Sequence, residues 1–156
     1  MNVLFVCTGN TCRSPMAASY FKGLCEARGL ADVEVDSAGI SSGFWPIADE
    51  ALQVLAENGN EVLSGTSKPL TKRLVERAHL VITMTRGHRD IIRRRYPEAT
   101  RKTHMLLSYI GKRKDVEDPV GMPVEAYRKS LKAMEPALKA MAEIVADPKV
   151  RFDAAG

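Results

Sequence analysis

A cysteine and an arginine, Cys7 and Arg13, stand near the start of the chain with five residues between them. The thiolate is the nucleophilic form of cysteine, and a guanidinium can hold two phosphate oxygens at once. A loop of this length can curl so that its backbone N–H groups point inward around an oxyanion. The spacing therefore predicts a phosphate-binding loop, in which Cys7 attacks phosphorus and Arg13 stabilises the developing charge.

The residues around this pair are predicted to bind the substrate: Thr8, Gly9, Asn10, Thr11, Cys12 and Ser14. We expect Gly9 to permit a backbone conformation that a side chain would obstruct, and Asn10 to tolerate the left-handed region. The Ser14 hydroxyl could donate to the Cys7 sulfur or cap the following helix, and the sequence does not choose between these roles. Amide donors, a helix N-terminus and a guanidinium together predict a lowered pKa for the Cys7 thiol.

Strand and helix patterns alternate along the chain and place this loop. We predict strands at residues 2–6, 33–35, 79–84 and 103–107, separated by helix-sized segments. One of these helices is expected to begin with Ser14 as its N-cap, and a final long helix carries one apolar stripe. The pattern indicates a single α/β domain over residues 1–156, a three-layer sandwich with a central parallel sheet of about four strands and helices on both faces. The segment after the first strand then lies at the carboxyl edge of the sheet, where ligands bind.

An acid is needed to protonate the leaving group, and Asp118 is the best candidate. Pro119 follows it directly and holds Asp118 outside the helical region, which stiffens the presentation of its carboxyl group. Asp115 and Glu117 are nearby competitors for the same role. With a nucleophile already identified, the sequence predicts that Asp118 lies across the phosphorus from Cys7.

The composition narrows the classes of function. The chain has 156 residues with a net charge of +4, and no apolar run approaches the roughly 20 residues that span a bilayer. We therefore expect a cytoplasmic protein with no membrane partner. Basic runs such as Arg93-Arg94-Arg95 have few aromatic neighbours, which argues against nucleic-acid binding. Three cysteines are too few for a disulfide scaffold, and neither zinc nor another cofactor is expected.

The motifs together resemble one known family. The loop reads C-T-G-N-T-C-R-S-P, and Ser37-Ala38-Gly39 and Asp118-Pro119 follow at appropriate separations. On these residues the chain resembles the low-molecular-weight protein tyrosine phosphatases over essentially its whole length. The resemblance implies a nucleophilic Cys7, phosphate binding by residues 8–13 and an acid role for Asp118. It also supports a reversible disulfide between Cys7 and Cys12 that would protect the thiolate from over-oxidation, with a buried filler as the alternative role of Cys12.

Three residues bear on the substrate. Thr11 stands where the family commonly has a bulky aliphatic residue, which looks like the bacterial protein-arginine phosphatase branch. Its hydroxyl could hydrogen-bond to a guanidinium, which isoleucine cannot do. Val120 stands where tyrosine-directed members often carry an aromatic residue. Trp45 instead favours phosphotyrosine, since its indole could form one wall of a slot for an aromatic ring. It could equally anchor the loop at residues 41–46.

We therefore predict a metal-independent phosphatase that hydrolyses phosphoarginine on proteins through a phosphocysteine intermediate. Its partners would be phosphorylated proteins and phosphate or other oxyanions. A tyrosine phosphatase of the same family is the alternative enzyme, and a phosphate-sensing module without turnover is the alternative from another class. Thiol-dependent arsenate reductases need two further cysteines near the middle of the chain, and residues 79–95 contain none.

Overall fold

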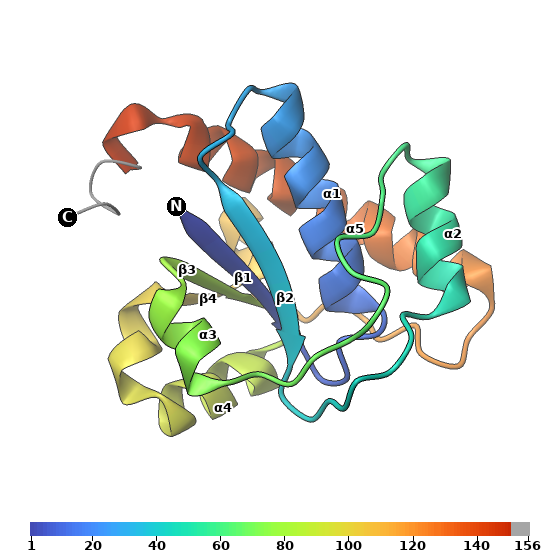
Figure 1. Ribbon diagram of the computed structural model, residues 1–156, viewed down its shortest axis with the longest axis horizontal. Coiled ribbons are helices and arrows are strands. Elements are labelled where there is room, and N and C mark those ends of the chain that lie inside the picture. Colours follow the sequence, from blue (N-terminus) through green and yellow to red (C-terminus); the bar gives the residue numbers. More distant parts are fainter. Residues whose placement is uncertain (151–156) are drawn as a thin grey trace.

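The computed structural model describes residues 1–150 and has a four-stranded parallel sheet at its centre (Figure 1). The strands are β1 (Asn2–Cys7), β2 (Glu34–Gly39), β3 (Leu80–Thr83) and β4 (Thr103–Met105), in the order β2-β1-β3-β4. Every neighbouring pair is parallel. The predicted single domain runs to residue 156, and its residues 151–156 lie outside the described part of the chain.

Helices cover both faces of the sheet, as predicted (Figure 1). One face packs against α1 (Arg13–Ala27), α2 (Asp49–Glu57) and α5 (Val124–Ala146), and the other against α3 (Lys72–Arg77) and α4 (Arg86–Arg95). The alternation of side chains along β1 separates the two cores. Phe5 packs on Phe21 of α1 at a ring-centroid distance of 5.4 Å, whereas Leu4 and Val6 point to the α3 and α4 side. The three-layer prediction is confirmed.

Three predicted boundaries are wrong. The second strand, predicted at residues 33–35, runs on to Gly39, because residues 36–39 continue to pair with β1. The fourth strand ends at Met105, because the buried residues Leu106 and Leu107 belong to a 3₁₀ helix, η2 (Leu106–Ile110), that continues the apolar pattern. Another 3₁₀ helix, η1 (Pro97–Lys102), precedes β4. Ser14 is not the N-cap of α1; that position is Cys12, two residues earlier, and its side chain makes no capping hydrogen bond. The Ser14 hydroxyl is used elsewhere, within the loop that precedes the helix.

The strand order places the first loop at a switch point of the sheet. The chain leaves β1 towards β2 on one side and later returns to β3 on the other, so a crevice opens at the carboxyl ends of β1 and β3. Met84, directly after β3, donates its N–H to Val6 O at 3.2 Å, and Val116 donates to Met84 O at 2.9 Å. The segment that carries Asp118 is thereby tied to the same edge as Cys7. None of the helices within residues 1–150 has the length and apolar character required to cross a membrane.

Candidate active site

A cavity of about 260 Å³ lies at this carboxyl edge. Its walls are formed by Cys7, Thr8, Gly9, Thr11, Cys12, Arg13, Trp45, Asp118 and Val120. All of these were predicted from the sequence as site residues, and they come from three segments that lie far apart in the chain. The other two predicted site residues, Asn10 and Ser14, do not line this cavity and lie behind the loop. The fold therefore gathers the predicted chemistry in one place.

A chain of hydrogen bonds behind the loop directs a proton to the sulfur of Cys7. The Lys68 backbone N–H donates to Asn10 Oδ1 at 3.0 Å, which fixes the orientation of that amide. Asn10 Nδ2 then donates to Ser14 Oγ at 2.8 Å. Ser14 Oγ lies 2.9 Å from Cys7 Sγ. Because this hydroxyl already accepts a hydrogen bond, its own hydrogen is free to point at the sulfur, which favours the thiolate.

The backbone of the loop depends on Asn10 more than on Gly9. Asn10 has a φ of 59° and is the one non-glycine residue with positive φ among residues 1–150. Its buried amide also donates to Ser37 Oγ at 2.9 Å, so side-chain hydrogen bonds offset the strain of the left-handed conformation. The prediction that a side chain at position 9 would obstruct the loop is wrong, because a Cβ there would meet nothing closer than Thr11 Oγ1 at 3.7 Å. The tight position is Gly39, where a Cβ would lie 2.7 Å from Thr8 O.

The environment of Cys7 contains opposing influences on its thiol. Burial raises the pKa of Cys7 above its ordinary value and is the largest effect. The Ser14 hydroxyl, the backbone N–H groups of Ser14 and Asn10, and the charge of Arg13 each lower it in part. The predicted lowering of the Cys7 pKa is therefore wrong, because burial outweighs the donors on which the prediction depended. The groups that stabilise a thiolate are nevertheless all in place.

Arg13 links the loop to the segment that carries Asp118. Its Nη1 donates to Val116 O at 3.1 Å, and its Nη2 lies 3.3 Å from Asp118 Oδ2. The Arg13 side chain is buried, whereas the Asp118 side chain is 43% exposed and lines the cavity. Asp118 Oδ1 accepts from the Val120 N–H at 3.1 Å, a turn that Pro119 helps to form. A carboxyl group thus lies on the cavity wall, in contact with the guanidinium of the loop.

The two competing carboxylates are placed differently. Asp115 Oδ1 accepts from the backbone N–H of Arg86 at 2.8 Å, so this side chain caps the start of α4. Glu117 belongs to a neighbouring cavity outside the walls of the Cys7 cavity. Of the three acids predicted near the loop, Asp118 is therefore the one that reaches the Cys7 cavity.

The remaining thiols have separate surroundings. Cys12 Sγ lies 3.4 Å from the Tyr127 hydroxyl of α5 and 3.6 Å from Thr11 Oγ1. Cys25 is fully buried in the core, and burial raises its pKa to about 11, as expected for an inert thiol. All three cysteines are free. The disulfide between Cys7 and Cys12 stays a prediction.

Trp45 and Val120 stand on the rim of the cavity. Trp45 is 51% exposed. Its backbone N–H donates to Ser67 Oγ at 2.9 Å, and its carbonyl accepts from the Ser67 N–H at 2.7 Å. The loop is thus anchored through the backbone, while the indole is left to wall the cavity. Val120 is 60% exposed on the same cavity.

The sequence analysis did not single out His88 as a residue of the site. Its Nε2 lies 2.8 Å from Thr8 Oγ1, directly beside the cavity. It also missed Lys68 and Ser37 as supports of Asn10. A histidine in the first turn after β3 could have been noticed, because the carboxyl ends of β1 and β3 are expected to lie near each other in a parallel sheet.

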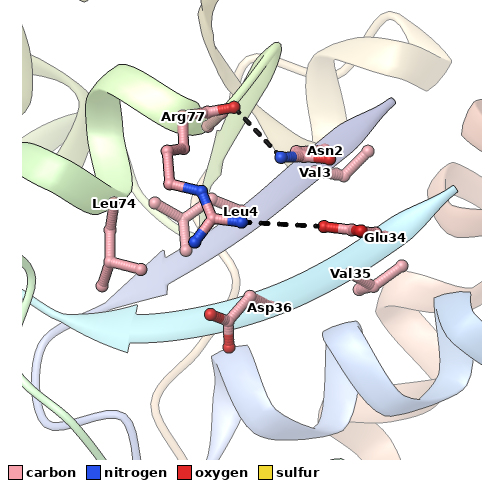
Figure 2. Close-up of a pocket in the computed structure, with 9 residues that line it drawn as sticks. Asn2, Val3, Leu4, Glu34, Val35, Asp36, Leu74 and Arg77 are labelled. Atoms are coloured by element: carbon pink, nitrogen blue, oxygen red, sulfur yellow. Dashed lines mark hydrogen bonds and ion pairs between the residues drawn. The ribbon is translucent and has the colours of Figure 1, made fainter.

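A second cavity, of about 150 Å³, lies at the opposite end of the sheet, between α3 and the beginnings of β1 and β2 (Figure 2). Figure 2 shows Arg77 reaching across it towards Glu34, with a separation of 4.0 Å. Its lining includes no cysteine and no histidine. The nucleophile and its donors are confined to the other end.

Comparison with known proteins agrees with this geometry. Residues 2–150 match the family described as low molecular weight phosphotyrosine protein phosphatase. The chain belongs to this family. Its members include curated proteins named protein-arginine-phosphatase. The relative from Geobacillus stearothermophilus is 43% identical over 143 residues, covering 90% of this chain and 93% of its own. The relative from Bacillus subtilis is 39% identical over 145 residues, covering 92% and 95% respectively.

A solved structure of the family has a similar fold. It is a structure of YwlE arginine phosphatase, in a variant that has serine in place of cysteine and carries a phosphorylated active-site serine. It is 35% identical, covers 96% of this chain and 99% of its own, and has a TM-score of 0.89. The fold class predicted from the sequence is confirmed by this likeness.

Proposed function

We propose that this protein removes phosphoryl groups from arginine residues of proteins, with Cys7 as nucleophile, Arg13 as oxyanion ligand and Asp118 as acid and base. The observation that carries the proposal is the single cavity lined by these three residues together with Thr11. The names of the two curated relatives support arginine as the phosphorylated residue. The phosphorylated serine in the related structure supports a covalent phosphoenzyme.

The proposed reaction has two steps. In the first, the Cys7 thiolate attacks phosphorus, so that an S–P bond forms while the P–N bond to the guanidine breaks. Asp118 gives its proton to the departing nitrogen. Arg13 and the loop N–H groups hold the phosphoryl oxygens as charge develops on them. In the second step, Asp118 takes a proton from water, which attacks phosphorus and breaks the S–P bond, releasing inorganic phosphate and the thiolate.

The residues around the nucleophile favour phosphoarginine over phosphotyrosine. Thr11 contributes a hydroxyl to the wall of the cavity, where a substrate guanidinium could hydrogen-bond to it. Val120, 60% exposed on the same cavity, offers only a small apolar surface to a phenol ring. The exposed indole of Trp45 is the observation that keeps phosphotyrosine as the second candidate, since it could pack on such a ring.

The test of substrate class compares one peptide that carries either phosphoarginine or phosphotyrosine. We expect the wild type to have the higher kcat/KM for phosphoarginine. Thr11→Ile should shift the ratio of the two kcat/KM values towards phosphotyrosine by at least about tenfold, because a matched polar contact is lost. Thr11→Ser, which keeps the hydroxyl, is the control and should retain the preference. An unchanged ratio in Thr11→Ile would remove Thr11 from substrate selection.

The test of mechanism uses Asp118→Asn with Glu117→Gln as the neighbouring control. Loss of a general acid should lower kcat on phosphoarginine peptide by about 10²- to 10⁴-fold, and by less on an aryl phosphate whose leaving group needs no proton. Glu117→Gln should retain activity. Cys7→Ser should abolish turnover while still binding vanadate. Full turnover by Cys7→Ser would contradict the mechanism, and absence of turnover by the wild type would favour a phosphate-sensing module.

Phosphorylated proteins are the proposed partners, and inorganic phosphate or another oxyanion is the proposed occupant of the loop. Three free thiols suit a reducing compartment, so we place the activity in the cytoplasm.

A further inference from the structure

A buried histidine lies directly behind the hydroxyl of Thr8. His88 stands in the first turn of α4, is 7% exposed, and has its Nε2 at 2.8 Å from Thr8 Oγ1. Thr8 itself is exposed and lines the same cavity as Cys7 and Arg13. One side of this hydroxyl therefore faces the imidazole, and the residue as a whole faces the site of chemistry.

The imidazole is neutral near pH 7. Burial lowers the pKa of His88 to about 4, and the positive charge of Arg13 acts in the same direction. Asp115 and Asp118 oppose this shift and are smaller influences. A neutral imidazole carries one hydrogen, so one ring nitrogen of His88 is a donor and the other is an acceptor.

The surroundings of the second nitrogen decide which one is the donor. His88 Nδ1 is buried, and no group within residues 1–150 hydrogen-bonds to it. A buried N–H without an acceptor is rarer and more costly than a lone pair without a donor. The hydrogen therefore resides on Nε2, and this N–H donates to Thr8 Oγ1.

We infer that His88 is a positioning residue, which fixes the Thr8 hydroxyl as a donor aimed into the cavity. Since Thr8 Oγ1 accepts from Nε2–H, the hydroxyl hydrogen is left to bind an oxygen of a bound oxyanion. A free hydroxyl rotates and could equally accept from the N–H groups of a guanidinium, which offers donors only. The imidazole thus assigns Thr8 to the phosphoryl group. Thr11 then remains available to bind the leaving group. This inference rests on the proposed function only for the identity of the bound anion.

The tautomer is measured directly by ¹⁵N NMR of the histidine-labelled wild-type protein near pH 7. We expect the His88 ring to show a protonated, pyrrole-type Nε2 and an unprotonated, pyridine-type Nδ1. A pyrrole-type Nδ1 would overturn the inference, because Thr8 would then donate to the ring and have no hydrogen for the anion. This measurement requires no turnover, so it stands apart from the test of the proposed function.

The coupling is measured by calorimetric titration with orthovanadate. Thr8→Val and His88→Leu should each weaken binding about tenfold, and the double variant should lose no more than about twofold beyond either. Thr8→Ser and His88→Gln keep a hydroxyl and an N–H donor at similar reach, and should remain within about threefold of the wild type. His104→Leu, a half-buried histidine on β4, is the control for loss of an imidazole and should bind vanadate as the wild type does.

Two outcomes of this titration would overturn the inference. Unchanged binding by Thr8→Val would show that the hydroxyl does not contact the anion. Losses that multiply in the double variant would show that His88 acts on the site independently of Thr8. Circular dichroism melting of each variant separates these effects from unfolding, and rescue by His88→Gln is the result that a purely structural role would not give.

Discussion

At the scale of single residues, the site depends on groups that do not line the cavity. Asn10, Ser14 and Lys68 form the hydrogen-bond chain behind the loop, and Cys7 receives its end. Asn10 and Ser14 could be predicted from their residue types, because asparagine tolerates positive φ and a hydroxyl can donate a hydrogen bond to a sulfur. Lys68 could not be predicted in this way, because it contributes only its backbone N–H and lies 58 residues from Asn10.

Two substitutions of Asn10 separate the contributions of its backbone conformation and of its hydrogen bonds to the free energy of unfolding. Asn10→Ala should lower the free energy of unfolding by about 2–4 kcal/mol, because it loses the amide contacts and keeps the strained φ. Asn10→Gly loses the same contacts but tolerates the conformation, so it should be more stable than Asn10→Ala by about 1 kcal/mol. Urea denaturation of both variants measures the difference. Equal stabilities would mean that the left-handed conformation costs nothing at this position.

At the scale of elements, α5 supports the site from a distance. Its Tyr127 hydroxyl contacts Cys12, and its Ser130 donates to the carbonyl of Glu117, next to Asp118. The apolar stripe predicted for this helix is buried against α1, α2 and the sheet. The periodicity of the sequence was enough to predict the helix and its buried face. The contacts that hold Cys12 and the acid loop could not be read from that pattern.

Leu138 and Ile144 offer a matched pair on α5. Leu138 is fully buried, so Leu138→Ala should lower the free energy of unfolding by about 2–5 kcal/mol. Ile144 is 41% exposed, and its change to alanine should cost under about 0.5 kcal/mol. Both variants should retain kcat/KM for the phosphorylated peptide at temperatures where they are folded. A similar loss of stability in the two variants would contradict the burial of the stripe.

At the scale of the whole molecule, the buried His88 makes the free energy of unfolding depend on pH. Its pKa is about 4 when folded and near 6.5 when unfolded, so the unfolded chain binds the proton first as the pH falls. The contribution of neutral His88 to the free energy of unfolding is therefore fully present above about pH 6.5 and is lost as the pH falls towards 4.

Denaturation curves at several pH values test this coupling. Between pH 7 and pH 4.5 the wild type should lose about 2 kcal/mol more than His88→Gln, which carries no titrating ring at this position. His104, whose pKa burial also lowers, contributes with the same sign in both proteins and cancels from the difference. Parallel pH profiles for the two proteins would mean that His88 is not held neutral by the fold.

The layered α/β architecture, the residues of the loop and the resemblance to the family could be predicted from the sequence, because short-range spacing encodes the strand, the turn and the helix that build the loop. The tertiary structure singles out Asp118 from the three candidate acids, since it places Asp115 and Glu117 outside the walls of the Cys7 cavity. It also showed that burial opposes ionisation of Cys7 and that His88 stands behind Thr8. These outcomes depend on distances between segments far apart in the chain, and local pattern carries no measure of such distances.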